Sequence, residues 1–237
     1  MYSYPEVHST VPGWLLALLS VALGAAGALA ELVPARGRRA PLRVRALLAV
    51  AVVVDAAEAV AYAIAMTMWL KRYTGVPRPN FAALCRGTAA PNGRIECTTK
   101  HGSDNSRQAF PSGHAAIMGA LGVYVSARLV TRFAAPRPWP PGRCTRLAAL
   151  RSAAESALVM VRNLSIRFAR ADVADAQPAC VTPLALSLWV SASRIHDYAH
   201  SAGDVCGGLL LGAAFGAVML LRTAALDRRL RQEAAPK

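Results

Sequence analysis

Five apolar runs alternate with polar segments along the chain. They cover residues 14–33, 46–70, 111–132, 178–192 and 204–221. A helix needs about 20 apolar residues to cross the hydrocarbon core of a bilayer, and all runs except the short fourth one approach or exceed this length. The pattern predicts an all-α protein, a polytopic transmembrane helical bundle of about five spans, in which residues 1–237 form a single domain.

Arginine is concentrated in three of the polar segments, which indicates how the spans are oriented. The three segments are residues 36–45, 133–177 and 222–237. Loops rich in Lys and Arg stay in the cytosol, and five spans place all three segments on that side. We therefore expect a cytosolic loop insertion at 133–177 and a basic cytosolic tail at 222–237. The N-terminus and the loops 71–110 and 193–203 then share the exoplasmic face, lumenal or extracellular.

Two features test this topology. The loop 71–110 is itself basic, which conflicts with the positive-inside rule unless its cations bind something anionic. The glycosylation sequon Asn163-Leu164-Ser165 falls in the cytosolic insertion, so a glycan there would overturn the topology. Residues 153–168 of the insertion, which include the sequon, are expected to lie on the membrane surface as an amphipathic helix.

The composition is strongly basic, with a formal net charge of +14. In a soluble protein such a charge would suggest a nucleic acid partner. Here the basic residues fall mostly between apolar spans, and no aromatic-basic surface motif accompanies them, so we expect no nucleic acid partner. The bilayer and its anionic lipids are the expected partners, and the oligomeric state is left unknown.

Two acidic residues interrupt the second apolar run. Asp55 and Glu58 would each cost about 2.5–3.5 kcal/mol at the centre of a bilayer, and as i and i+3 they share a helix face. We expect this face to look into the bundle, where the carboxylates pair with a neighbouring helix. The alternative is that they line the pathway of a transporter or channel.

Two of the five cysteines, Cys85 and Cys97, occur in the same polar loop. They could form a disulfide if that loop faces an oxidising compartment, and free thiols are an equally good reading. The remaining three have no metal-type spacing. They are Cys144, Cys180 and Cys206.

Charged residues are concentrated in residues 193–204, between the last two apolar runs. They are Arg194, His196, Asp197, His200 and Asp204. Burying such groups at a membrane is costly, so their presence indicates a function. If the chain is helical from His200, that residue and Asp204 are i and i+4 and share a face.

Glycine continues this face in steps of four residues, at Gly208, Gly212 and Gly216. A seam of small residues is typical of close helix packing in membranes. We therefore expect this face of the last span to lie against a neighbouring helix, with His200 and Asp204 pointing into the bundle.

Three polar clusters fall on one predicted membrane face and together have the chemistry of a phosphate site. The clusters are Lys71 with Arg78-Pro79, then Pro111-Ser112-Gly113-His114, then Arg194 with His200 and Asp204. Lys71, Arg78 and Arg194 supply positive charge, and arginine can bind phosphate oxygens bidentately. Ser112 and Gly113, at the start of a helix, add backbone N–H donors and the positive end of the helix dipole.

Two histidines offer a nucleophile and an acid. His200, oriented by Asp204, can attack phosphorus as a neutral imidazole, with the carboxylate holding its tautomer. His114 can protonate the departing alkoxide. Phosphoryl transfer depends mainly on positioning and charge neutralisation, which protein cations can supply, so we expect no metal and no other cofactor.

In this order and spacing, the clusters resemble the three signature motifs of the type 2 phosphatidic acid phosphatase (PAP2) superfamily. The third cluster, with Asp197-Tyr198 between its arginine and histidine, is most similar to the lipid phosphate phosphatase branch. The resemblance implies a membrane phosphatase that needs no Mg2+ and passes through a phosphohistidine. It implies that His200 is the nucleophile, Asp204 its partner and His114 the acid. The residues implied to bind phosphate are Lys71, Arg78, Ser112, Gly113 and Arg194.

The same resemblance implies the substrates, which are phosphatidate, lysophosphatidate, sphingoid-base phosphates and diacylglycerol pyrophosphate. The chain departs from the branch in two ways. Six spans are usual there, so the first would be missing here, and Ser201 stands where a second histidine is common. Neither departure bears on the chemistry described above.

Two other functions fit parts of the pattern. His196, His200 and Asp204 at steps of four could line one helix face as the ligands of a metal-dependent membrane hydrolase. That function leaves the motif at 111–114 and the arginines without a role. A non-enzymatic scaffold or lipid-binding protein of the same fold is the other, although intact His114, His200 and Asp204 favour an enzyme.

Overall fold

The structure is a computed structural model that describes residues 4–34, 40–89, 95–98, 104–133 and 177–234. The predictions about the loop insertion, its amphipathic helix and its sequon fall outside the described residues.

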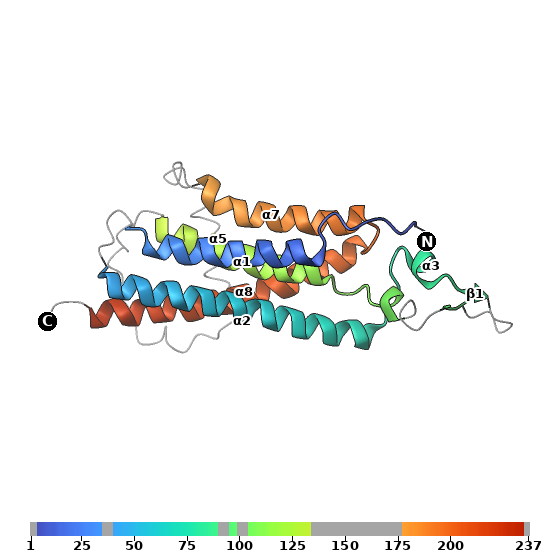
Figure 1. The fold of residues 1–237 in the computed structure, drawn as a ribbon. Helices are drawn as coiled ribbons and strands as arrows, with labels where there is room; N and C mark the ends of the chain where they lie inside the picture. Colours follow the sequence, from blue (N-terminus) through green and yellow to red (C-terminus); the bar gives the residue numbers. More distant parts are fainter. Residues whose placement is uncertain (1–3, 35–39, 90–94, 99–103, 134–176, 235–237) are drawn as a thin grey trace, which may run out of the picture.

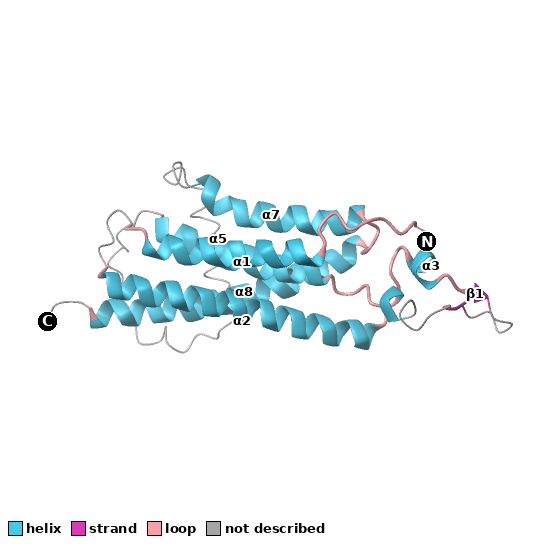
Figure 2. Ribbon diagram, viewed as in Figure 1, coloured by secondary structure: helices cyan, strands magenta, loops and turns pink. Residues whose placement is uncertain are grey.

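Five long helices form an elongated up-and-down bundle (Figures 1 and 2). In chain order they are α1 (Gly13–Leu32), α2 (Leu42–Thr74), α5 (Gly113–Phe133), α7 (Gln177–His196) and α8 (Ala202–Glu233). Consecutive helices run in opposite directions, and each occupies the place of one predicted apolar run. The prediction of an all-α membrane bundle is confirmed.

Four of these helices, α1, α2, α5 and α8, are long and apolar enough to cross a membrane, by length and composition. Helix α7, in the place of the shortest predicted run, is not among them. It carries buried serines, and one of these contacts α5: the Ser187 hydroxyl donates to Met118 O at 2.5 Å.

Helices α2 and α8 extend furthest beyond the predicted runs. Helix α2 continues through Lys71 to Thr74 and ends at Gly75, whose left-handed conformation (φ 59°) lets its N–H bond to Lys71 O. Helix α8 continues to Glu233, so most of the segment expected as a basic tail is helical. Both extensions carry basic side chains in the last turn of the helix, Lys71 and Arg72 in α2 and Arg231 in α8.

The acidic residues of α2 pair with α8, as predicted. Asp55 is buried, lies 3.3 Å from Arg222 Nε and accepts a hydrogen bond from the Thr223 hydroxyl. Glu58 accepts from Arg222 Nη1. Pairing of this kind offsets the cost of placing carboxylates in a membrane helix.

A second buried network was not predicted. Glu31 of α1 is ion-paired with Arg128 of α5, and Arg132 donates to the carbonyls of Ala30 and Val33. These bonds satisfy the open carbonyls at the C-terminal end of α1 and attach that end to α5.

Helix α5 is the centre of the bundle, where it contacts all four other long helices. Its contact with α8 follows the glycine seam. A Cβ atom on Gly212 or Gly216 would collide with a backbone carbonyl of α5, and one on Gly208 with the carbonyl of Ser112, the residue just before α5. The predicted close approach is therefore confirmed, because no other residue type leaves room for the two backbones at this distance.

The segment between α2 and α5 builds a small lobe at the N-terminal end of the bundle (Figure 1). It contains helix α3 (Phe81–Cys85) and the antiparallel strands β1 (Thr88–Ala89) and β2 (Ile95–Glu96). Cys85 and Cys97 form a disulfide, which decides between the two readings of these cysteines.

Candidate active site

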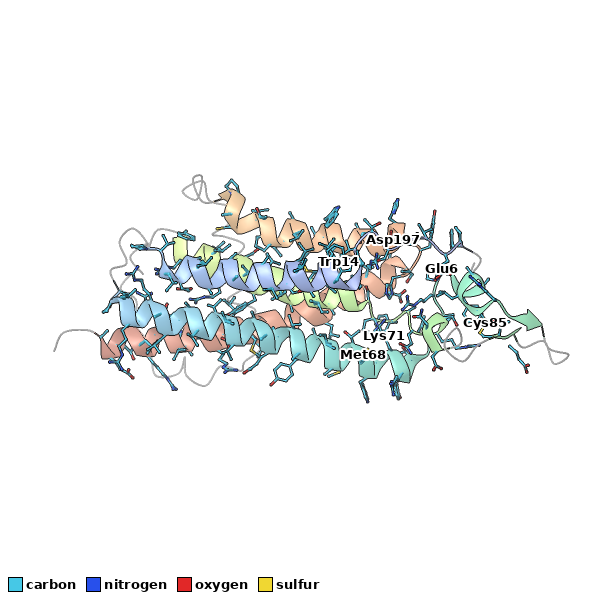
Figure 3. The ribbon with its side chains drawn as sticks, in the orientation of Figure 1. Glu6, Trp14, Met68, Lys71, Cys85 and Asp197 are labelled. Atoms are coloured by element: carbon cyan, nitrogen blue, oxygen red, sulfur yellow. A yellow bond between two sulfur atoms is a disulfide. The ribbon has the colours of Figure 1, made fainter. Side chains whose placement is uncertain are left out.

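The three polar clusters meet at the end of the bundle that carries the N-terminus and the disulfide lobe, where Figure 3 labels Lys71 and Asp197. Lys71 is mostly buried in the last turn of α2, and its ammonium donates to Gln108 O at 2.9 Å. Two backbone bonds continue the contact, from Arg78 N to Ser106 O and from Ala109 N to Val76 O. The first cluster thus lies alongside the residues that lead into α5.

The second cluster is joined to the third through the backbone. Ser112, which is fully buried, donates its N–H to Asp204 O at 2.9 Å and so connects the start of α5 to the first turn of α8. A cis peptide bond between Phe110 and Pro111 precedes it. The Ser112 hydroxyl has no hydrogen-bond partner among the described residues.

The chain reverses sharply between α7 and α8, which corrects the prediction that it is helical from His200. Helix α7 ends at His196, and Tyr198 adopts a left-handed conformation (φ 54°) of the kind that closes many helices. The carbonyl of Arg194 accepts from the N–H groups of Ala199 and His200. This turn brings His200 back beside Arg194, and both are buried.

Asp204 still faces His200, for a different reason than predicted. Ser201 is the N-cap of α8, and it forms a capping box with Asp204: Ser201 N donates to Asp204 Oδ2 at 2.7 Å, and Asp204 N donates to the Ser201 hydroxyl at 3.2 Å. The same carboxylate oxygen lies 3.9 Å from His200 Nδ1. The helix cap therefore holds the carboxylate beside the imidazole.

The charges of the site favour a neutral imidazole at His200. Its burial, together with the positive charges of Arg78 and Lys71, lowers the pKa of His200 to about 2, and a hydrogen bond with the Ala109 backbone opposes this only in part. Burial and the charge of Arg194 also lower the pKa of Arg78. A neutral imidazole has a free electron pair on one ring nitrogen. The cations around it attract anions.

His114 contacts a part of the chain that sequence analysis did not connect with it. Its Nε2 lies 3.0 Å from Val11 O. A carbonyl oxygen can only accept, so Nε2 carries a proton and Nδ1 is left to take up or release a second one.

Asp197 and Thr10 were also missed as site residues. Asp197 is buried, is ion-paired with Arg194 and accepts two hydrogen bonds from Thr10. No signal in one sequence could have joined residues that lie almost a whole chain apart. Gly113, expected to bind phosphate, is the first residue of α5, and an added Cβ there would make an ordinary contact with Thr67, at 3.6 Å.

A pocket of about 340 Å3 opens beside His200 and Asp204. Its other walls are mostly apolar or aromatic, namely Tyr4, Val76, Pro77, Pro79, Ile195 and Tyr198, with Ser201. The pocket therefore joins the polar side chains of His200, Ser201 and Asp204 to apolar and aromatic walls.

The helix face proposed for metal ligands does not exist. His196 ends α7 and His200 lies in the turn before α8, so the two are not on one helix with Asp204. The His196 side chain is 80% exposed. Within the described ranges, no three His, Cys, Asp or Glu side chains are grouped so as to hold a metal ion.

A helical bundle with apolar spans and a buried cluster of basic side chains at one end defines a membrane protein with a polar site at the end of its helices. Residues 47–227 match the PAP2 superfamily, which is more than half of the chain. The chain belongs to this superfamily, whose members are phosphatases. The match covers all three clusters but excludes α1 and the residues before it. Comparisons with curated proteins and with solved structures found no match.

Proposed function

We propose that the protein is a lipid phosphate phosphatase that hydrolyses phosphatidate and related lipid phosphates without Mg2+, through a phosphohistidine. The convergence of the three motifs at one end of the bundle carries the proposal. One buried polar atom from each motif lacks a hydrogen-bond partner within the described part of the chain: Arg78 Nε, Ser112 Oγ and His200 Nδ1. Such atoms also occur elsewhere, for instance at Ser126, but these three belong to one site. Phosphate oxygens would accept from the arginine and the serine.

The first step transfers the phosphoryl group to His200. Nε2 attacks phosphorus, and the bond from phosphorus to the lipid alkoxide breaks. Asp204, 3.9 Å from Nδ1, accepts the Nδ1 proton in a hydrogen bond and stabilises the positive charge on the ring. Catalytic hydrogen bonds are often long before substrate binds, so this distance is compatible with the role. His114 gives a proton to the alkoxide.

The second step releases phosphate. His114 takes a proton from water as the water oxygen attacks phosphorus, and the bond from phosphorus to His200 breaks. Inorganic phosphate leaves, and both histidines return to their starting protonation states. Lys71, Arg78 and Arg194 would neutralise the charge of the transferring group, with N–H donors at Ser112 and Gly113.

The apolar and aromatic walls of the pocket support a lipid as the substrate. A phosphate held near His200 would place its esterified group against Tyr4, Pro79 and Tyr198, at the end of membrane-spanning helices. Acyl chains could then stay in the bilayer while the headgroup reacts. In the topology expected from the arginine distribution, this end is the exoplasmic face.

The test is phosphate release from phosphatidate in detergent micelles with EDTA present, for wild type and His200→Ala. We expect wild-type activity and a loss of at least about a thousandfold in His200→Ala, because the nucleophile is removed. His196→Ala is the comparison variant, because that side chain is exposed and reaches Asp197 Oδ1 only at 3.4 Å; it should keep most of its activity.

Other outcomes contradict the proposal in distinguishable ways. Activity that requires added Mg2+ or Zn2+, with loss in both histidine variants, would indicate a metal-dependent hydrolase. Equal rates on a short water-soluble phosphate and on phosphatidate would refute lipid preference. No release from any lipid phosphate would indicate a non-enzymatic scaffold of this fold.

A further inference from the structure

The N-terminal segment, residues 4–12, contacts all three clusters of the site. Tyr4 N donates to Pro79 O at 3.4 Å in the first cluster. Val11 O accepts from His114 in the second. Thr10 bonds to Asp197 in the turn that carries the third. This segment precedes residues 47–227, which match the superfamily.

The contact with Asp197 is the most specific of the three. The Thr10 hydroxyl donates to Asp197 Oδ1 at 2.5 Å, and Thr10 N donates to Oδ2 at 2.9 Å. Oδ2 also accepts from Arg194 Nη2. Thr10 therefore fixes both oxygens of the carboxylate that holds the guanidinium of Arg194.

Among the described residues, this arrangement leaves donors of Arg194 free for an anion. A guanidinium has five N–H donors. Arg194 uses Nη2 for one oxygen of Asp197 and approaches the Ser193 hydroxyl with Nε. If Oδ1 were released from Thr10, the carboxylate could rotate and bind Arg194 with both oxygens, which would compete with phosphate for the same donors.

We propose that Thr10 is a positioning residue of the phosphatase: by holding Asp197, it orients Arg194 toward the phosphate of the substrate. The inference rests on the function proposed above and adds a residue from outside the matched region to that site. Burial alone would raise the pKa of Asp197. The two bonds from Thr10, helped by a hydrogen bond from His196 and the charge of Arg194, lower this pKa below its ordinary value, so the carboxylate stays ionised as this role requires.

A stacked aromatic pair holds the segment in place independently of Thr10. The rings of Tyr4 and Tyr198 lie parallel, with centroids 4.6 Å apart. Thr10 itself is exposed, and its backbone N–H contact does not depend on the side chain. A variant that removes the Thr10 hydroxyl should therefore fold normally.

The test compares Thr10→Val, which keeps the shape and removes the hydroxyl, with Thr10→Ser, which restores it. Thr182→Val is the matched control, because the hydroxyl of this exposed threonine bonds within α7, to Pro178 O. Isothermal titration with inorganic phosphate gives Kd, and phosphatidate hydrolysis gives kcat and KM. We expect Thr10→Val to raise both Kd and KM by about 3- to 10-fold, with Tm unchanged and recovery in Thr10→Ser.

Three results would overturn the inference. If wild type is active and Thr10→Val matches Thr182→Val in Kd and kcat/KM, the positioning role is wrong and the proposed function stands. If wild type neither binds phosphate nor releases it from lipids, both proposals fall together. Losses in Thr10→Val that follow a lower Tm and persist in Thr10→Ser would also refute positioning.

Discussion

The close contact between α5 and α8 makes a quantitative prediction for Gly212→Ala. A Cβ atom at this position would lie 2.8 Å from Ala116 C and Ala120 N, and nearer still to Ala116 O. These obstacles are helix backbone, so they cannot rotate aside as a side chain would. The helices must separate along the seam, and overpacking of this kind costs about 1–3 kcal/mol.

The matched control lies on the same helix. Gly203→Ala would place its Cβ 3.7 Å from the Ser201 hydroxyl, an ordinary contact. Both substitutions gain up to about 1 kcal/mol from the better helix propensity of alanine. The difference between the two variants therefore isolates the cost of the collision with α5.

The assay is thermal unfolding in detergent, followed by the circular dichroism of the helices. For a net loss of about 1–2 kcal/mol, Gly212→Ala should melt roughly 2–8 °C below wild type, on the scale of about 2–4 °C per kcal/mol for this chain length. Gly203→Ala should melt at or above the wild-type temperature. Equal melting temperatures for the two variants would refute the described contact between α5 and α8.

Two further predictions concern the turn between α7 and α8. Because the pKa of His200 falls from 6.5 to about 2 on folding, the unfolded chain binds more protons between these values, so stability is lost as pH drops below 6.5. His200→Asn should remove this pH-dependent loss of stability. From about pH 7.5 to about pH 5, the free energy of unfolding should fall by roughly 2 kcal/mol more in wild type than in the variant. Equal losses would contradict the shifted pKa. Tyr198, with φ 54°, holds a conformation that costs non-glycine residues about 1 kcal/mol or more. Tyr198→Gly should therefore be about 1 kcal/mol more stable than Tyr198→Ala, although both lose the stack on Tyr4, and the reverse order would show that the turn is not strained.

Much of the fold could be predicted because hydrophobic patterning is a local property. The lengths of the apolar runs indicated the helices, and the steps of four from Gly208 to Gly216 indicated which face of α8 is buried. The pairing of Asp55 and Glu58 with a neighbouring helix followed from the cost of charge in a membrane. Helix ends were less predictable, because α2 and α8 continue past their apolar runs on charged residues that packing and capping stabilise.

The composition of the site was also readable from the sequence, but its construction was not. The spacing of Lys71, Arg78, His114, Arg194, His200 and Asp204 indicated phosphate chemistry. Asp204 reaches His200 because the capping box at Ser201 holds its carboxylate. His200 lies beside Arg194 because of a sharp turn with a left-handed residue at Tyr198, which is not a residue type that predicts one. The reading of His196 as a metal ligand was wrong for the same reason, because it assumed a continuous helix.

The sequence by itself therefore determined the class of fold, the buried faces and the residue types of the site, since each depends on neighbours within a few positions. The tertiary structure alone decided which distant groups complete that site. Thr10 meets Asp197 and Val11 meets His114 only because the bundle returns the N-terminus to the end where α7 and α8 join. Contacts of such long sequence separation are set by packing of the whole chain, and no local pattern records them.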